Sequence, residues 1–189
     1  MKKALLIAAL ASLTALLAVA VARAATTGTI TVNAVVAAGA TLSIAPVGSP
    51  SFNLTLTGVD QVATYTLPVI IVDARGLAVG GGWNLTVTST QFKDASAHTF
   101  PTTASTITLV TPSCGTSSTC TLPTNNVVNT NLAVPAAAVA PAAVKYENAA
   151  TATGLGTTNV NATVSVAVPS NVFAGTYTST VTVSIIAGP

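Results

Sequence analysis

Apolar and polar side chains alternate along several short stretches of this chain, and the clearest stretch contains its single tryptophan. Trp83, Leu85 and Val87 fall on one face of an extended strand, while the residues between them are polar. The preceding strand is predicted to end at Val72, and a glycine-rich turn at 73–82 joins the two. Because the indole is the largest apolar group in the chain, this strand is expected near the middle of the core.

Similar alternation predicts about eight strands in total. The run at 64–72 contains Pro68, which has no N–H and therefore indicates an edge position or a bulge. The last two predicted strands are separated by a turn containing Gly175 and are expected to form an antiparallel hairpin. The pattern indicates an all-β fold, a single antiparallel β-sandwich of the Ig-like or Greek-key type. The other predicted strands are 29–36, 41–46, 52–57, 107–110, 163–168 and 177–185.

The first 24 residues are predicted to be a secretory signal peptide. Lys2 and Lys3 precede an almost wholly apolar run at 4–21, and Ala22-Arg23-Ala24 has the small residues of a cleavage site. An uncleaved membrane anchor is the alternative, since the apolar run is about long enough to span a bilayer. Residues 25–189 are expected to form the secreted domain.

Composition supports an extracellular β-protein rather than a cytoplasmic enzyme. Only 5% of the residues are charged, and the predicted cleavage removes three of the six basic residues, leaving three against four acidic ones, a net charge of −1. Such a chain cannot neutralise a run of phosphates, so no nucleic-acid partner is expected. No membrane association is expected after cleavage of the signal peptide.

Cys114 and Cys120 are the only two cysteines, and in a secreted chain an even count predicts a disulfide bond. The region 133–143 is rich in alanine and carries Pro135 and Pro141, so it is expected to be an extended insertion or an irregular strand rather than an uninterrupted helix.

No arrangement of residues predicts catalysis, a metal site or a cofactor. His98 is the only histidine and is interpreted as a solvated loop residue. Neither a nucleophile elbow nor paired catalytic carboxylates accompany it. One histidine and two cysteines of a predicted disulfide also leave too few ligands for a closed metal site. The protein is therefore expected not to be an enzyme.

The order of motifs resembles the WxL domain of Gram-positive cell-surface proteins. In that family a Trp-x-Leu motif follows an Asp-x-Arg-Gly turn, and a second Trp-x-Leu occupies the last strand. Here the last strand has Val183-Ser184-Ile185 at that place, so the second motif is absent. The stretches that carry the resemblance are Leu42-Ser43-Ile44-Ala45-Pro46, Ser51-Phe52-Asn53, Asp73-Ala74-Arg75-Gly76, Trp83-Asn84-Leu85, Gly154-Leu155-Gly156, Val168-Pro169 and 174–180.

The resemblance implies a secreted, non-catalytic module that attaches non-covalently to the cell wall, with peptidoglycan as the polymer bound. It makes Trp83, Leu85, Asp73 and Arg75 candidate binding residues. Another interpretation places Trp83 and Leu85 in the core, and assigns Asp73 and Arg75 to fixing the turn before Trp83. The expected partners are a cell-wall polymer or other surface proteins.

A structural role is the alternative function. The N-terminal strand expected at 26–36 lies just after the cleavage site and is free to leave its own sheet, and Thr-rich strands without charge lack the residues that normally block strand addition. Such a chain could self-associate as the subunit of an extracellular filament or pilus, assembled by donor-strand exchange.

Overall fold

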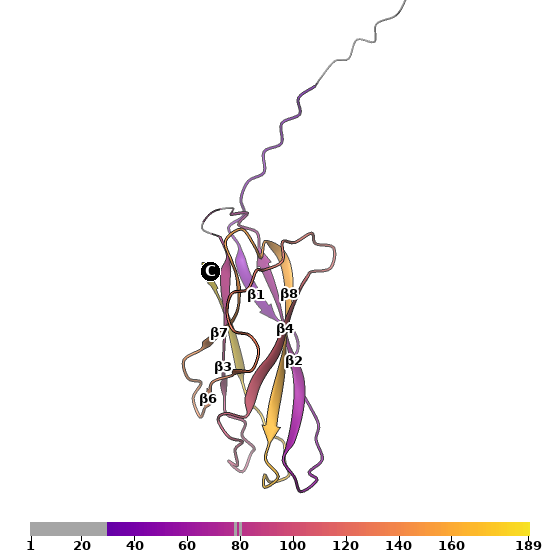
Figure 1. Ribbon diagram of the computed structural model, residues 1–189, viewed down its shortest axis with the longest axis vertical. Coiled ribbons are helices and arrows are strands. Elements are labelled where there is room, and N and C mark those ends of the chain that lie inside the picture. The colour runs from indigo at the N-terminus through magenta and orange to yellow at the C-terminus, as the bar shows by residue number, and fades with distance from the viewer. Residues whose placement is uncertain (1–29, 78, 80) are drawn as a thin grey trace, which may run out of the picture. The chain divides into compact units, whose positions relative to one another are not determined.

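The computed structural model describes residues 30–77, 79 and 81–189. Residues 36–189 form one compact unit, and the described residues 30–35 belong to a separate unit. Every regular element in the described residues is a β-strand (Figure 1), which confirms the predicted all-β sandwich. Among these residues, no helix has the length and apolar character needed to cross a membrane. The predicted signal peptide, residues 1–24, lies outside the described residues.

The larger sheet contains five strands in the order β1-β2-β8-β4-β5, all antiparallel to their neighbours. Its two longest strands, β2 and β8, pair without interruption from Gln61↔Val168 to Asp73↔Gly156. The strands of this sheet are β1 (Leu42–Pro46), β2 (Gln61–Asp73), β4 (Ser105–Cys114), β5 (Leu132–Ala133) and β8 (Gly156–Val168).

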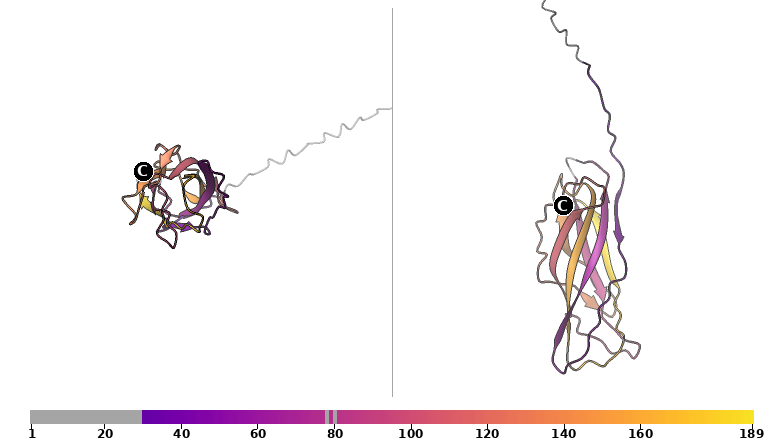
Figure 2. Two further views of the ribbon diagram at one scale, coloured as in Figure 1. Left: turned by 90° about the horizontal axis from the view of Figure 1, so that it is seen from below. Right: turned by 90° about the vertical axis from the view of Figure 1, so that its right-hand side faces the viewer.

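The smaller sheet is built around β3 (Trp83–Thr90), the tryptophan strand. On one edge β3 pairs antiparallel with β9 (Val181–Ala187), from Trp83↔Ala187 to Ser89↔Val181. Its other edge pairs with β7 (Val144–Ala149), antiparallel, and then with β6 (Ala136–Ala137), the one parallel pairing in the described residues. Strands of both sheets run along nearly the same direction in Figure 1 and in the right-hand view of Figure 2.

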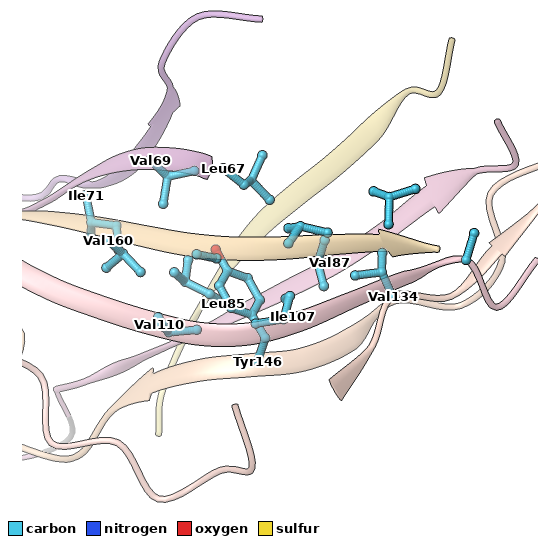
Figure 3. Packing of buried hydrophobic residues seen from close by; sticks show 14 of the residues in the cluster. Leu67, Val69, Ile71, Leu85, Val87, Ile107, Val110, Val134, Tyr146 and Val160 are labelled. Atoms are coloured by element: carbon cyan, nitrogen blue, oxygen red, sulfur yellow. The ribbon is translucent and has the colours of Figure 1, made fainter. Parts of the chain in front are cut away.

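The core lies between the two sheets and follows the predicted period of two. Along β8 every second side chain is buried, so Val160, Val164 and Val166 are inaccessible to solvent. They belong to one core cluster with Leu85 and Val87 of the smaller sheet and Tyr146 of β7, and Figure 3 shows Val160 on the same side as these residues. Tyr146 and its strand were not predicted, because β7 mixes apolar and polar residues on both faces.

The prediction that the last two strands form a hairpin is wrong. β8 pairs with β2 and β4 in the larger sheet, whereas β9 pairs with β3 in the smaller one. The connection from Pro169 to Thr180 is much longer than a hairpin turn and carries the chain from one sheet to the other. Alternation alone predicted the strands but could not indicate which neighbour each one pairs with.

The predicted strand at 52–57 is also absent, although Phe52 and Leu54 do point inward and are half-buried. The ladder between β1 and β2 ends at Pro46↔Val69, followed by one further bond from Val47 N to Pro68 O. In a strand, the N–H and C=O of one residue point to the same edge. The Pro68 carbonyl points to the edge of β2 that faces β1, so the N–H that Pro68 lacks would also have pointed to that edge. Pro68 thus marks the end of pairing, as predicted for an edge position.

Residues 30–36 form no strand, contrary to the prediction for 29–36, of which Thr29 lies outside the described residues. An isolated extended segment leaves its backbone N–H and C=O groups without partners, so alternation does not suffice to make a strand. Ile30 is 90% exposed and Val32 is 86% exposed, and Val35 and Val36 are exposed as well.

The predicted disulfide bond is confirmed. Cys114 and Cys120 form a disulfide bond that closes a short loop after β4. The Ala/Pro-rich region 133–143 is extended and contributes only the last residue of β5 and the two-residue β6.

Candidate functional site

The Trp-x-Leu motif begins β3 and points into the core. The side chains of Trp83, Leu85 and Val87 are all 0% exposed. The indole Nε1 donates a hydrogen bond to the backbone carbonyl oxygen of Gly154, at 3.1 Å. A buried indole needs such an acceptor, because an unpaired buried N–H is costly.

Asp73 and Arg75 hold the turn that leads into this strand. Asp73 is the last residue of β2 and is 2% exposed. Its Oδ1 accepts from the backbone N and the Nε of Arg75, and its Oδ2 accepts from Nη2 at 2.7 Å. The same Nη2 donates to the carbonyl oxygen of Gly82, the residue before Trp83, also at 2.7 Å. The hydrogen bond to Asp73 outweighs burial and raises the pKa of Arg75.

This arrangement fixes backbone conformation rather than presenting charge to solvent. The Arg75 side chain is 13% exposed and that of Asp73 is 0% exposed, so the pair is largely shielded from solvent. Arg75 connects the end of β2 to the start of β3 and therefore sets how the two sheets are joined at Trp83.

His98 lies in the loop after β3 and is half-exposed, close to the solvated position that was predicted. Its Nδ1 is 2.7 Å from Asp94 Oδ2, and its backbone N donates to Asp94 Oδ1. Burial alone would raise the pKa of Asp94, but the hydrogen bonds from His98 lower it overall. The imidazole stacks on Phe173, with ring centroids 4.2 Å apart, so His98 connects two loops.

At the end of β3 remote from Trp83, a cleft opens between the segment 46–56 and the connection 172–181, with a volume of about 1010 Å³. We call it the aromatic cleft, because six of the eight aromatic residues in the chain line it. These residues are Phe52, Tyr65, Phe92, Phe100, Phe173 and Tyr177.

Five of the six rings of the aromatic cleft, all except Phe173, pack against one another in a continuous row. Phe52 stacks on Tyr65 with centroids 6.3 Å apart and meets Phe92 edge-on. Phe92 then contacts Phe100, whose centroid lies 4.3 Å from that of Tyr177. Burial raises the pKa of Tyr65 to about 12, so its hydroxyl is neutral at physiological pH. The lining also includes uncharged polar residues, among them Ser51, Asn53 and Thr176.

A buried carboxyl group lies on β7, outside the motif and the cleft. Glu147 is 1% exposed, and its Oε2 accepts one hydrogen bond from Asn129 Nδ2, at 3.0 Å. Its Oε1 is buried without a hydrogen-bond partner in the described residues. Burial raises the pKa of Glu147 to about 7, although the bond from Asn129 acts in the opposite direction. The connector 121–131 contacts this group through Asn129, and it is anchored to β7 where Asn148 N donates to Asn125 Oδ1 and Asn126 N donates to Asn148 Oδ1.

The family comparison agrees with the motif order. A model of the WxL domain, described as a surface cell wall-binding domain, matches residues 25–189. The chain belongs to the WxL family. Searches of curated proteins and of solved structures returned no match to this chain.

The WxL assignment indicates which residues of β9 stand at the place of the family's second Trp-x-Leu motif. Val183 and Ile185, which occupy the place of the second Trp-x-Leu, lie directly beside Val87 and Leu85 of the first motif. The two motif positions are therefore neighbours in one sheet, although about 100 residues separate them along the chain. With smaller side chains here, Val183 and Ile185 remain only partly buried.

The four candidate binding residues of this WxL domain are brought together at one end of β3, but they are turned inward. A direct contact between their side chains and a polymer stays a prediction. The aromatic cleft and Glu147 were missed, since both depend on segments that only the fold brings together. For the cleft, no signal along the sequence indicated that these aromatic residues lie together.

Proposed function

We propose that this WxL domain binds peptidoglycan non-covalently at the cell surface and that the aromatic cleft is its contact surface. The observation that carries the proposal is the match of residues 25–189 to a family of surface cell wall-binding domains. Cell-wall association is the property of the family, and the choice of peptidoglycan among wall polymers is part of the proposal.

The chemistry of the aromatic cleft suits a glycan chain with short peptides. Sugar rings present apolar C–H faces that pack on aromatic side chains, and their hydroxyl groups bond to neutral polar side chains. The cleft offers both kinds of group, and Phe173 is 62% exposed at its edge. Within this proposal Asp73, Arg75, Trp83 and Leu85 act indirectly, by holding β3 and the sheets in place.

Sedimentation with purified, insoluble peptidoglycan tests the proposal. The protein should pellet with the polymer, and Phe173→Ala should weaken this binding several-fold without loss of stability, because the ring is exposed. Val139→Ala is the matched control, since Val139 is 83% exposed and lies outside the cleft.

The outcomes test the choice of polymer and the choice of contact surface separately. If the wild-type protein stays in the supernatant, peptidoglycan is the wrong polymer, and repeating the assay with intact walls identifies an accessory wall polymer instead. If Phe173→Ala and Tyr177→Ala both pellet as the wild type does, peptidoglycan binding stands and the cleft assignment fails.

A filament subunit is the second candidate function. The observation that favours it is the exposure of Ile30, Val32, Val35 and Val36, since apolar side chains so exposed in one short segment mark an interaction site. Electron microscopy of the native cell surface tests this candidate, which requires regular fibres that contain the protein.

A further inference from the structure

The outer edge of β9 is an unpaired strand edge in the described part of the chain. Gly188 N donates to Gly82 O, and Thr90 N donates to Thr180 O, so the even-numbered residues of β9 direct their backbone groups toward β3. Successive residues alternate, so Val181, Val183, Ile185 and Ala187 direct theirs to the other edge. No strand among the described residues pairs with that edge.

The apolar face of β9 is incompletely covered along the same edge. Val181, Val183 and Ile185 point toward the core but are only partly buried. β1 lies close to β9 across the seam between the two sheets, and its Leu42 and Ile44 are also only partly buried. A further strand beside β9 would cover these side chains and satisfy the free backbone groups.

Nothing along the edge opposes such an addition. Exposed edge strands are usually protected by lysine, inward-facing charges, proline or a bulge. β9 contains no charged residue and no proline, and it pairs with β3 without a bulge.

Residues 30–36 have the properties of the missing strand. The segment has the same length as β9, seven residues, and it contains neither charge nor proline. Ile30, Val32, Ala34 and Val36 share one face at a period of two, while Thr31, Asn33 and Val35 lie on the other, mostly polar face. Ile30 and Val32 are nearly fully exposed, so their burial is still available to drive an association.

We propose that residues 30–36 of one copy add as a strand to the free edge of β9 in a second copy. Each copy carries one donor segment and one acceptor edge, so the contact is head-to-tail and extends into a chain of copies unless it closes into a ring. The inference deepens the filament candidate by naming the acceptor. It does not depend on peptidoglycan, which is absent from the test below.

Two lysine variants separate the donor from the acceptor. The donor-dead variant is designed so that residues 30–36 can no longer add to another copy. Its substitutions, Ile30→Lys and Val32→Lys, place charges on the apolar face of the segment. In the acceptor-dead variant, Thr182→Lys and Ser184→Lys place charges on the exposed face of β9, where they leave the core unchanged. The matched controls are Thr31→Lys with Asn33→Lys on the polar face of the segment, and Asn161→Lys with Ala167→Lys at exposed positions of β8, which is paired on both edges.

Analytical ultracentrifugation of the full chain, as processed by the producing cell, gives the readout. The wild type and both controls should form oligomers that grow with concentration, and each dead variant alone should stay monomeric. An equimolar mixture of the two dead variants should form dimers and nothing larger, because only one donor and one acceptor remain between them.

The proposal is overturned if the wild type is monomeric at every concentration, if either dead variant associates as the wild type does, or if the mixture stays monomeric. Hydrogen exchange adds a second criterion. Amides of residues 30–36 should become protected only on association, and protection in a monomer would show that the segment closes on its own chain instead. A failure to pellet with peptidoglycan would leave all these outcomes unchanged.

Discussion

Trp83 and Gly154 fit together so closely that neither position tolerates a different shape. The indole Nε1 lies 3.1 Å from the Gly154 carbonyl oxygen, and a Cβ added to Gly154 would lie 2.5 Å from the same nitrogen. Gly154 also has φ = 69°, in the left-handed region. The Gly-x-Gly segment noted in the sequence therefore supplies both the acceptor for the tryptophan and the space that its ring needs.

We predict that Gly154→Ala is much more destabilising than Gly48→Ala. Both glycines have φ near +70°, so both variants incur the cost of a left-handed alanine, about 1 kcal/mol. At Gly48 a Cβ would meet nothing within 4 Å, whereas at Gly154 it would collide with Trp83 and Ala149. We expect about 2 kcal/mol or more of additional loss from urea unfolding, as for overpacked cores. Equal losses would mean that the indole is not held against Gly154, and a red-shifted Trp83 emission in the wild type would say the same.

Arg75→Gln should cost about 2–4 kcal/mol, because it leaves the carboxylate of Asp73 buried without its ion pair. The loss should appear in thermal unfolding, and backbone amides around the turn at Gly82 should exchange faster. Lys93→Gln is the control, since Lys93 is exposed. Equal stability of the two variants would contradict a role for Arg75 in holding the turn.

Glu147 should make the domain less stable as the pH rises toward neutrality. Its folded pKa, about 7, lies above the ordinary value of 4.5, so between these values the folded state holds a proton that the unfolded state has lost. The free energy of unfolding should therefore fall between about pH 4.5 and pH 7, by at most about 3 kcal/mol.

The Glu147→Gln variant isolates this effect, because it keeps the shape of the side chain and cannot titrate. The difference in unfolding free energy between the wild type and Glu147→Gln should change across this pH range and become constant above it. A difference that is independent of pH would show that Glu147 has an ordinary pKa in the folded protein.

Loss of the disulfide bond should have a modest and local effect. Replacing Cys114 and Cys120 by serine should lower the free energy of unfolding by about 2 kcal/mol, the loop-entropy value for so short a loop. The loop is also held to β8 by bonds from Gly115 N to Thr157 O and from Thr121 N to Leu155 O, so it should keep its position. Intact mass after alkylation should show no free thiol before reduction, and two alkylated thiols would contradict the bond.

Local pattern predicted the fold class well, because the period of two along β2, β3 and β8 reflects direct contact of each strand with the core. It failed where a strand needs a particular neighbour. Residues 30–36 and 52–57 alternate as well as β9 does, but only β9 has a partner in the described residues. Alternation reports the face that is buried, and pairing depends on the whole topology.

The candidate site was predictable only in part for the same reason. The Asp73–Arg75 pair could be expected because the two residues are only two positions apart, whereas the bond from Arg75 to Gly82 depends on the course of the whole turn. The aromatic cleft combines Phe52, Phe92 and Tyr177 from three distant segments, and no spacing along the chain indicates their proximity.

The pairing of β3 with β9 has a consequence for the order in which the protein can be completed. β3 is made early, but one of its edges stays open until residues 181–187 have been synthesised. Until then Trp83 and Leu85 lack part of their cover, and the nascent chain is a substrate for chaperones and proteases. A copy that terminates before β9 would keep one edge of this apolar strand uncovered.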